Sequence, residues 1–190
     1  MKSFIKNWGL FLLVLAAFII LRVYFLTPVS VKGHSMDPTL NDGQKLLTLK
    51  TQEADRFDII TLKEPDDLSK LAVKRVIGLP GETVEMHDDQ LTIDGKNVPE
   101  PYLEEYLTLF AAENLAKVYE YNPDFQAIAE NATNFTDDFT FTVPEDEYFV
   151  LGDNRLVSKD SRYFGFVKDS YVQGKVIWRY WPINEMKIFN

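Results

Sequence analysis

The hydrophobic pattern begins with one long apolar run near the amino terminus. Trp8 to Leu21 are fourteen apolar residues in a row, and Val23 to Leu26 extend the run to nineteen with only Arg22 interrupting it. A transmembrane helix needs roughly 20 apolar residues, whereas a run of fourteen alone also suits the hydrophobic region of a signal peptide. Because no small-x-small cleavage site follows and Arg22 can extend its charge to the interface, we expect residues 8–26 to form a retained transmembrane helix.

The charges that flank this run are only a weak indicator of its orientation in the membrane. Two lysines precede the run, while Arg22 and Lys32 lie at its other end. Long domains are translocated largely regardless of charge, so short flanks count most. We therefore expect a single-pass protein of the cell membrane, with residues 1–7 as a cytoplasmic tail and residues 27–190 as a domain on the outer face.

From Val31 onward, short β-rich segments alternate with turn signals. Asn41-Asp42-Gly43 and Leu79-Pro80-Gly81 are examples of such turns, since glycine accepts positive φ and proline presets the first turn dihedral. Many short strands at this spacing predict a mainly β domain of coiled antiparallel sheets or a partly open barrel. The expected strands are 44–49, 58–62, 71–77, 83–86, 91–93, 139–143, 148–151 and 172–181.

Residues 100–140 depart from the strand pattern. Between Tyr102 and Tyr121 apolar residues recur at roughly helical intervals, among abundant alanine and glutamate. We expect a small helical or irregular insertion here, and we assign it no catalytic role.

Composition narrows the possible functions. With 190 residues and 46% hydrophobic content the chain can bury one substantial core, so one main domain is expected. A net charge of -9 argues against a nucleic-acid partner, because phosphate binding needs a basic face. The chain has no cysteine, which excludes thiol chemistry and disulfides, and its two histidines, His34 and His87, lie in unrelated contexts. We expect neither a metal nor a cofactor, and lysine becomes a better candidate than histidine for a catalytic base.

The first stretch whose side chains could take part in catalysis is Gly33-His34-Ser35-Met36-Asp37-Pro38-Thr39-Leu40. Ser35 is the candidate nucleophile, and it would need a base and donors for an oxyanion. Lys74 is the candidate base, because strand alternation places it beside Ala72 and Val76, where desolvation would lower its pKa. Each residue also has a plain alternative: the octapeptide is an ordinary turn, and Lys74 points to solvent from a strand edge.

A third cluster, residues 152–165, is dense in side chains that form hydrogen bonds. One interpretation is a tight turn closed by an ion pair between Asp160 and Arg162. A functional loop would instead place a hydroxyl group against the lysine nitrogen and fix its orientation. Ser158 is our choice for that hydroxyl.

Taken in order, these blocks resemble the bacterial type I signal peptidases, the membrane-bound Ser/Lys endopeptidases that remove signal peptides from exported preproteins. The chain is most similar to their Gram-positive-like forms with a single anchor. The resemblance covers nearly the whole chain, and it rests on the apolar run, the octapeptide around Ser35, the segment Lys74-Arg75-Val76-Ile77-Gly78-Leu79-Pro80-Gly81-Glu82 and residues 152–165.

The resemblance implies a role for each matching residue. Ser35 would be the nucleophile, Lys74 the general base and Ser158 the hydroxyl that orients the lysine. Some members of the family carry a serine two residues before the nucleophile, but this chain has Gly33 there. The backbone N–H of Ser35 would then stabilise the oxyanion. The remaining candidates are Asp160 and Arg162 as a supporting pair, Gly152, Asp153 and Asn154 as the turn beside the site, and Met36 and Pro38 in the substrate pocket.

The expected partners are secretory preproteins, cut after small residues in an Ala-x-Ala pattern, together with the lipid bilayer. We expect a monomer. Two rivals share the implied fold. A self-cleaving repressor would need a DNA-binding domain where the apolar run stands, and a non-catalytic secretion or pilus-assembly chaperone should have lost Ser35 or Lys74, which are both present.

Overall fold

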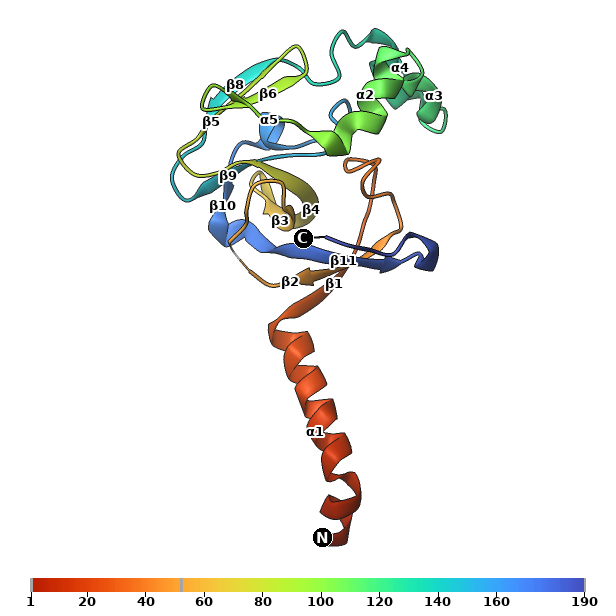
Figure 1. The fold of residues 1–190 in the computed structure, drawn as a ribbon, viewed down its shortest axis with the longest axis vertical. Helices are drawn as coiled ribbons and strands as arrows, with labels where there is room; N and C mark the ends of the chain where they lie inside the picture. The colour runs from red at the N-terminus through yellow and green to blue at the C-terminus, as the bar shows by residue number, and fades with distance from the viewer. Residues whose placement is uncertain (1, 52, 190) are drawn as a thin grey trace.

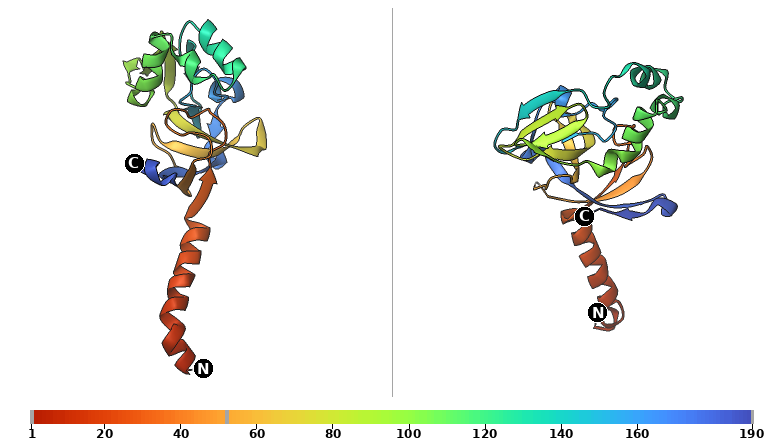
Figure 2. Two further views of the ribbon diagram at one scale, coloured as in Figure 1. Left: turned by 90° about the vertical axis from the view of Figure 1, so that its right-hand side faces the viewer. Right: turned by 45° about the horizontal axis from the view of Figure 1, so that its top comes forward.

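The N-terminal segment is one helix that projects from a β-rich body (Figures 1 and 2). The computed structural model describes residues 2–51 and 53–189, with side chains from Trp8 onward except that of Leu21. Helix α1 (Lys2–Tyr24) exposes its apolar side chains; Leu10, for example, is 77% exposed.

The expected transmembrane span differs from this helix in two respects. Within the described part of the chain, no helix has both the length and the apolar character needed to cross a membrane, so the span 8–26 is not confirmed. Its bounds also differ, because α1 ends at Tyr24 and a strand begins at Leu26. Most of the expected tail, 1–7, belongs to the helix from Lys2 onward, and Met1 lies outside the described residues.

The larger of two sheets carries the candidate site. Its strands are β1 (Leu26–Ser30), β2 (Lys45–Leu49), β3 (Ile59–Glu64), β4 (Asp67–Gly78), β9 (Glu147–Leu151), β10 (Val167–Lys168), β11 (Val172–Trp181) and β12 (Lys187–Ile188). The order is β1-β2-β11-β3-β4-β9-β10, with β12 on β11, and the pairs are antiparallel. The expected antiparallel architecture is confirmed, but among the described residues no pairing joins β10 to β1, so the sheet is not a closed barrel.

A smaller sheet packs against the first and shares a core with it. Its strands are β5 (Thr83–His87), β6 (Gln90–Ile93), β7 (Lys96–Asn97) and β8 (Phe139–Thr142), in the order β7-β6-β5-β8. Ile77 and Leu151 of the large sheet pack in one buried cluster with Val84 and Leu91 of the small sheet. Alternating apolar positions thus give each sheet one face that is buried against the other.

The insertion is helical, as its spacing predicted. It contains η1 (Pro101–Leu103), α2 (Glu104–Ala111), α3 (Leu115–Val118) and α4 (Pro123–Asn131), and lies at the end of the body away from α1 (Figure 1). The helices enclose a core of their own that includes Leu103, Tyr106 and Tyr119. Three further short helical turns complete the fold: α5 (Ser161–Phe164), η2 (Asp169–Tyr171) and η3 (Ile183–Glu185).

Candidate active site

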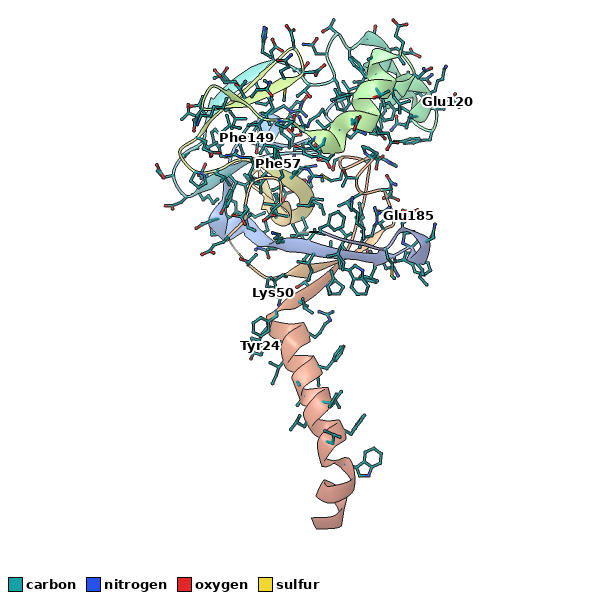
Figure 3. All side chains as sticks on the ribbon, in the orientation of Figure 1. Tyr24, Lys50, Phe57, Glu120, Phe149 and Glu185 are labelled. Carbon is teal, nitrogen blue, oxygen red and sulfur yellow. The ribbon has the colours of Figure 1, made fainter. Side chains whose placement is uncertain are left out.

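One groove brings Ser35 and Lys74 together. The cavity has a volume of about 1180 Å³, and its lining includes residues 27–36, both of these side chains and the start of β4. Among the residues that the structure describes, β1 pairs only with β2, and β4 pairs with β9 only from Arg75 onward. Two strand edges with unpaired backbone groups therefore flank the groove. Figure 3 labels Lys50, one of the lining residues, where α1 joins the body.

The segment that carries Ser35 is held by its backbone. Gly33 has a φ of 82°, a left-handed conformation that favours glycine, and its N–H donates to Asp42 Oδ1 at 2.7 Å. The carbonyl oxygen of Ser35 accepts from Asn154 N at 3.1 Å, and that of His34 accepts from Asn154 Nδ2 at 3.0 Å. Neither the N–H nor the hydroxyl of Ser35 forms a hydrogen bond within the described part of the chain, so both are available to a ligand.

Lys74 is a buried lysine without a counter-ion. Its side chain lies opposite Ile60 of β3 and is 3% exposed. Among the described residues Nζ forms no ion pair and no hydrogen bond with the protein, since the nearby Asp153 and Asp160 carboxylates pair with Arg75 and Arg162. Burial lowers the pKa of this ammonium group to about 8, although the negative charges of Asp160 and Glu64 act in the opposite direction. The interpretation of Lys74 as a solvent-facing edge residue is therefore wrong.

Gly152 lies in close contact with both Ser158 and the backbone of Ser35. A Cβ atom at Gly152 would lie 2.1 Å from Ser158 Oγ and 2.3 Å from the carbonyl oxygen of Ser35. Ser158 Oγ is buried and, among the described residues, has no hydrogen-bond partner. The expected hydrogen bond from this hydroxyl to Lys74 is therefore not formed in the structure, although the hydroxyl is buried and available.

Two buried ion pairs hold the loop that follows β9. Arg162 binds Asp160 through both oxygens, with Nε to Oδ1 at 2.8 Å, so the ion pair is present, while its support of the site stays a prediction. Asp160 Oδ2 also accepts from Gly152 N at 3.0 Å. The second pair was not anticipated: Arg75 Nε donates to Asp153 Oδ1 at 2.8 Å, and Asp153 is fully buried.

The insertion reaches this loop as well. Tyr119 O–H donates to Asn154 Oδ1 at 2.6 Å, so the amide that holds the nucleophile segment is itself held by α3 and the turn after it. Arg155, fully buried, pairs with Glu100 at the start of the insertion. Local patterns gave no signal for either contact, because the partners are 35 and 55 residues apart.

Of the two residues expected in the substrate pocket, one lines the cavity and the other does not. Met36 is buried and lines the cavity, whereas Pro38 is not part of its lining. Glu64 from β3 and Phe125 from α4 also line the groove, and neither was predicted.

The two histidines have separate partners in the fold. His34 Nδ1 lies 3.0 Å from Asp37 Oδ2, in the turn expected for it. His87 lies at the end of β5, where it, Asp88 and Asp138 each place one potential ligand atom within 4.8 Å of the others. All three are exposed, and exposed acidic groups are common without an ion.

A serine and a buried lysine in one groove are characteristic of serine hydrolases that use a lysine base. Comparisons with known proteins agree with this class. Residues 4–181 match the family described as signal peptidase, peptidase S26. The chain therefore belongs to the signal peptidase family.

Individual relatives cover nearly the whole chain. Signal peptidase I of Streptococcus pneumoniae is 45% identical, over 99% of this chain and 98% of that protein. Signal peptidase IB of Staphylococcus aureus is 36% identical, over 98% of this chain and 95% of that protein. The crystal structure of a signal peptidase I from Enterococcus faecalis is 41% identical and matches with a TM-score of 0.50, covering 66% of this chain and 97% of that one.

Proposed function

We propose that this chain is a serine endopeptidase that cleaves signal peptides from exported preproteins, with Ser35 as the nucleophile and Lys74 as the general base. The observation that carries the proposal is a lysine buried without a counter-ion in the same groove as an unbonded serine hydroxyl. Membership of the signal peptidase family supports the substrate class. The non-catalytic alternative is not favoured, since a chaperone has no use for this pair.

The chemistry follows from the charge state of the lysine. Neutral Lys74 takes the proton of Ser35 Oγ as that oxygen attacks the scissile carbonyl carbon. The oxyanion is stabilised by the backbone N–H of Ser35, which is unbonded in the structure. The lysine ammonium then protonates the leaving amine, and an ester to Ser35 remains. Water, deprotonated by the same lysine, hydrolyses that ester and restores the serine.

The substrate would lie extended between the two strand edges of the groove. Unpaired backbone groups of β1 and of β4 before Arg75 can form main-chain hydrogen bonds to a peptide. Met36 supplies an apolar wall beside Ser35, suited to the small residues of an Ala-x-Ala sequence. Ser158, Asp160, Arg162 and the turn 152–154 would support the base and the nucleophile without touching the substrate.

The membrane location is part of the same proposal. Apolar side chains of α1 such as Leu10, Leu13 and Phe18 are exposed along a helix that projects from the body (Figure 2). Association of this helix with the bilayer, with the amino terminus in the cytoplasm and the groove on the outer face, would cover them. A monomer suffices, because one chain supplies every residue of the site.

Incubation of the purified full chain with a preprotein in detergent tests the activity. The expected product is the shortened protein, cut after a small residue and identified by mass spectrometry. Ser35→Ala should leave no product. Ser69→Ala is the matched control, because Ser69 lines the same cavity but donates its hydroxyl to Asp67. Full cleavage by Ser35→Ala, or none by the wild type, would contradict the proposal.

Activity should rise with pH as Lys74 loses its proton. With a pKa near 8, about one tenth of the lysine is neutral at pH 7 and about nine tenths at pH 9. Glu64→Gln should move the midpoint of the kcat/KM profile to lower pH, because the negative charge of Glu64 raises the lysine pKa. Asp66→Asn is the control, since Asp66 pairs with Lys159 as Glu64 does but is not among the charges acting on Lys74. An unchanged midpoint in Glu64→Gln would exclude this electrostatic effect.

A further inference from the structure

The helical insertion places aromatic side chains beside the nucleophile. The ring of His34 lies 4.6 Å from that of Tyr121 and 6.4 Å from that of Phe125. His34 and Phe125 both line the groove that contains Ser35, although Phe125 comes from α4 and follows Ser35 by 90 residues. A region with no catalytic motif therefore contributes a wall to the catalytic groove.

This wall is fixed in place. Asn122 caps α4 by accepting hydrogen bonds from Asp124 N at 3.0 Å and Phe125 N at 3.4 Å. The ring of Phe125 packs edge-on against Tyr119 and Tyr121, at 6.0 and 6.3 Å between centroids. Tyr119 in turn bonds to Asn154, which holds the Ser35 segment. A preorganised aromatic surface loses little conformational entropy when it binds a side chain.

The position of the wall indicates which part of a substrate would meet it. β1 runs from the end of α1 toward Ser35, and the insertion lies on the far side of the body from α1 (Figure 1). A signal peptide whose apolar part shares the bilayer with α1 would approach along β1. Its residues before the scissile bond would then lie beside residues 27–33, and the residues after that bond would extend toward α4.

We propose that Phe125, together with Tyr121 and His34, forms a subsite for the side chain that follows the scissile bond and favours an apolar residue there. The proposal rests on the proposed endopeptidase function and deepens it. Phe125 lines the groove and is only partly buried, so an apolar side chain that covers it gains contact area that a small polar one does not. Tyr121 does not line the groove, but its ring packs against those of His34 and Phe125. The insertion would thus select among mature amino termini, whereas β1 and β4 select the signal peptide.

Two peptides that differ in one residue test the subsite. Both carry the same signal sequence ending in Ala-x-Ala, and the next residue is leucine in one and serine in the other. The wild type should favour the leucine peptide by about tenfold in kcat/KM, the size expected for one apolar side chain in an apolar pocket. In Phe125→Ala the ratio should fall toward one, because kcat/KM for the leucine peptide should fall about tenfold more than kcat/KM for the serine peptide.

Two further variants separate recognition from folding. Ile128→Ala changes an exposed residue of the same helix that does not line the groove, and should leave the ratio unchanged. Tyr121→Ala should reduce the ratio as well, and keeps the test open if Phe125→Ala lowers the melting temperature. A wild type without preference, or a Phe125→Ala variant that loses activity equally on both peptides, would overturn the subsite. If the wild type cuts neither peptide, the endopeptidase function itself fails, and the subsite with it.

Discussion

We expect Lys74→Met to abolish cleavage and, at pH 7, to make the protein more stable by about 3 kcal/mol. The expected loss of activity follows because Lys74 is the proposed acceptor of the Ser35 proton and a methionine thioether cannot accept it. The gain follows from the lysine pKa, which falls from 10.5 to about 8 on folding, at 1.36 kcal/mol per unit. Methionine fills a similar space without a charge to desolvate, so the cost of burying the ammonium disappears.

The sign of the stability effect gives this prediction a second test. The unfolded chain binds the lysine proton more readily than the folded one, so the cost is fully present below pH 8 and vanishes as pH rises through 10.5. Urea unfolding of both proteins at pH 7 and near pH 10.5 should show a difference that shrinks with pH. A variant that is inactive but less stable than the wild type at pH 7 would mean that Lys74 is a charged structural residue.

Gly152→Ala should lower kcat/KM by at least about a hundredfold, since displacement of reacting groups by about 1 Å can have that effect. Its Cβ would lie 2.1 Å from Ser158 Oγ and 2.3 Å from the Ser35 carbonyl oxygen, distances that real Cβ atoms do not show. The backbone of Ser35 or the loop carrying Ser158 must therefore move. The strain should also reduce the free energy of unfolding by about 1–3 kcal/mol.

Gly95→Ala provides the comparison for that experiment. Gly95 has a positive φ of 72°, so alanine is strained there, but no atom lies within 4 Å of the added Cβ. It should lose about 1 kcal/mol of stability and keep full activity. If Gly152→Ala were equally active, the packing between Ser158 and the Ser35 carbonyl would have no part in catalysis.

Local sequence patterns predicted most of the strands, because alternation of apolar and polar residues is set within a few positions. Each of the eight expected strands overlaps one in the structure. β1 was missed, since Leu26-Thr27-Pro28-Val29-Ser30 is short, contains proline and becomes a strand only by pairing with β2. Proline is tolerated there because β1 is an edge strand.

Contacts in the site between residues far apart in the sequence could not be predicted from such local patterns. Burial of Lys74 could be anticipated from its neighbours in one strand. The partners of Arg75 and Asn154 could not, since Asp153 lies 78 residues from Arg75, and Tyr119 belongs to a helical insertion without catalytic motifs. Contacts of this kind depend on how separate elements pack, and no single segment encodes them.

The connection between α1 and β1 is short, so the helix and the groove are closely linked. Only Phe25 separates the two elements, and Lys50 holds both sides, with Nζ donating to Val23 O and N donating to Phe25 O at 2.8 Å. Most of the path from the end of the helix to Ser35 is therefore a strand of fixed length, five residues or about 17 Å. If α1 lies in a bilayer, Ser35 stays at a limited distance from the membrane surface. Only peptides that present their cleavage site at that distance can then reach Ser35.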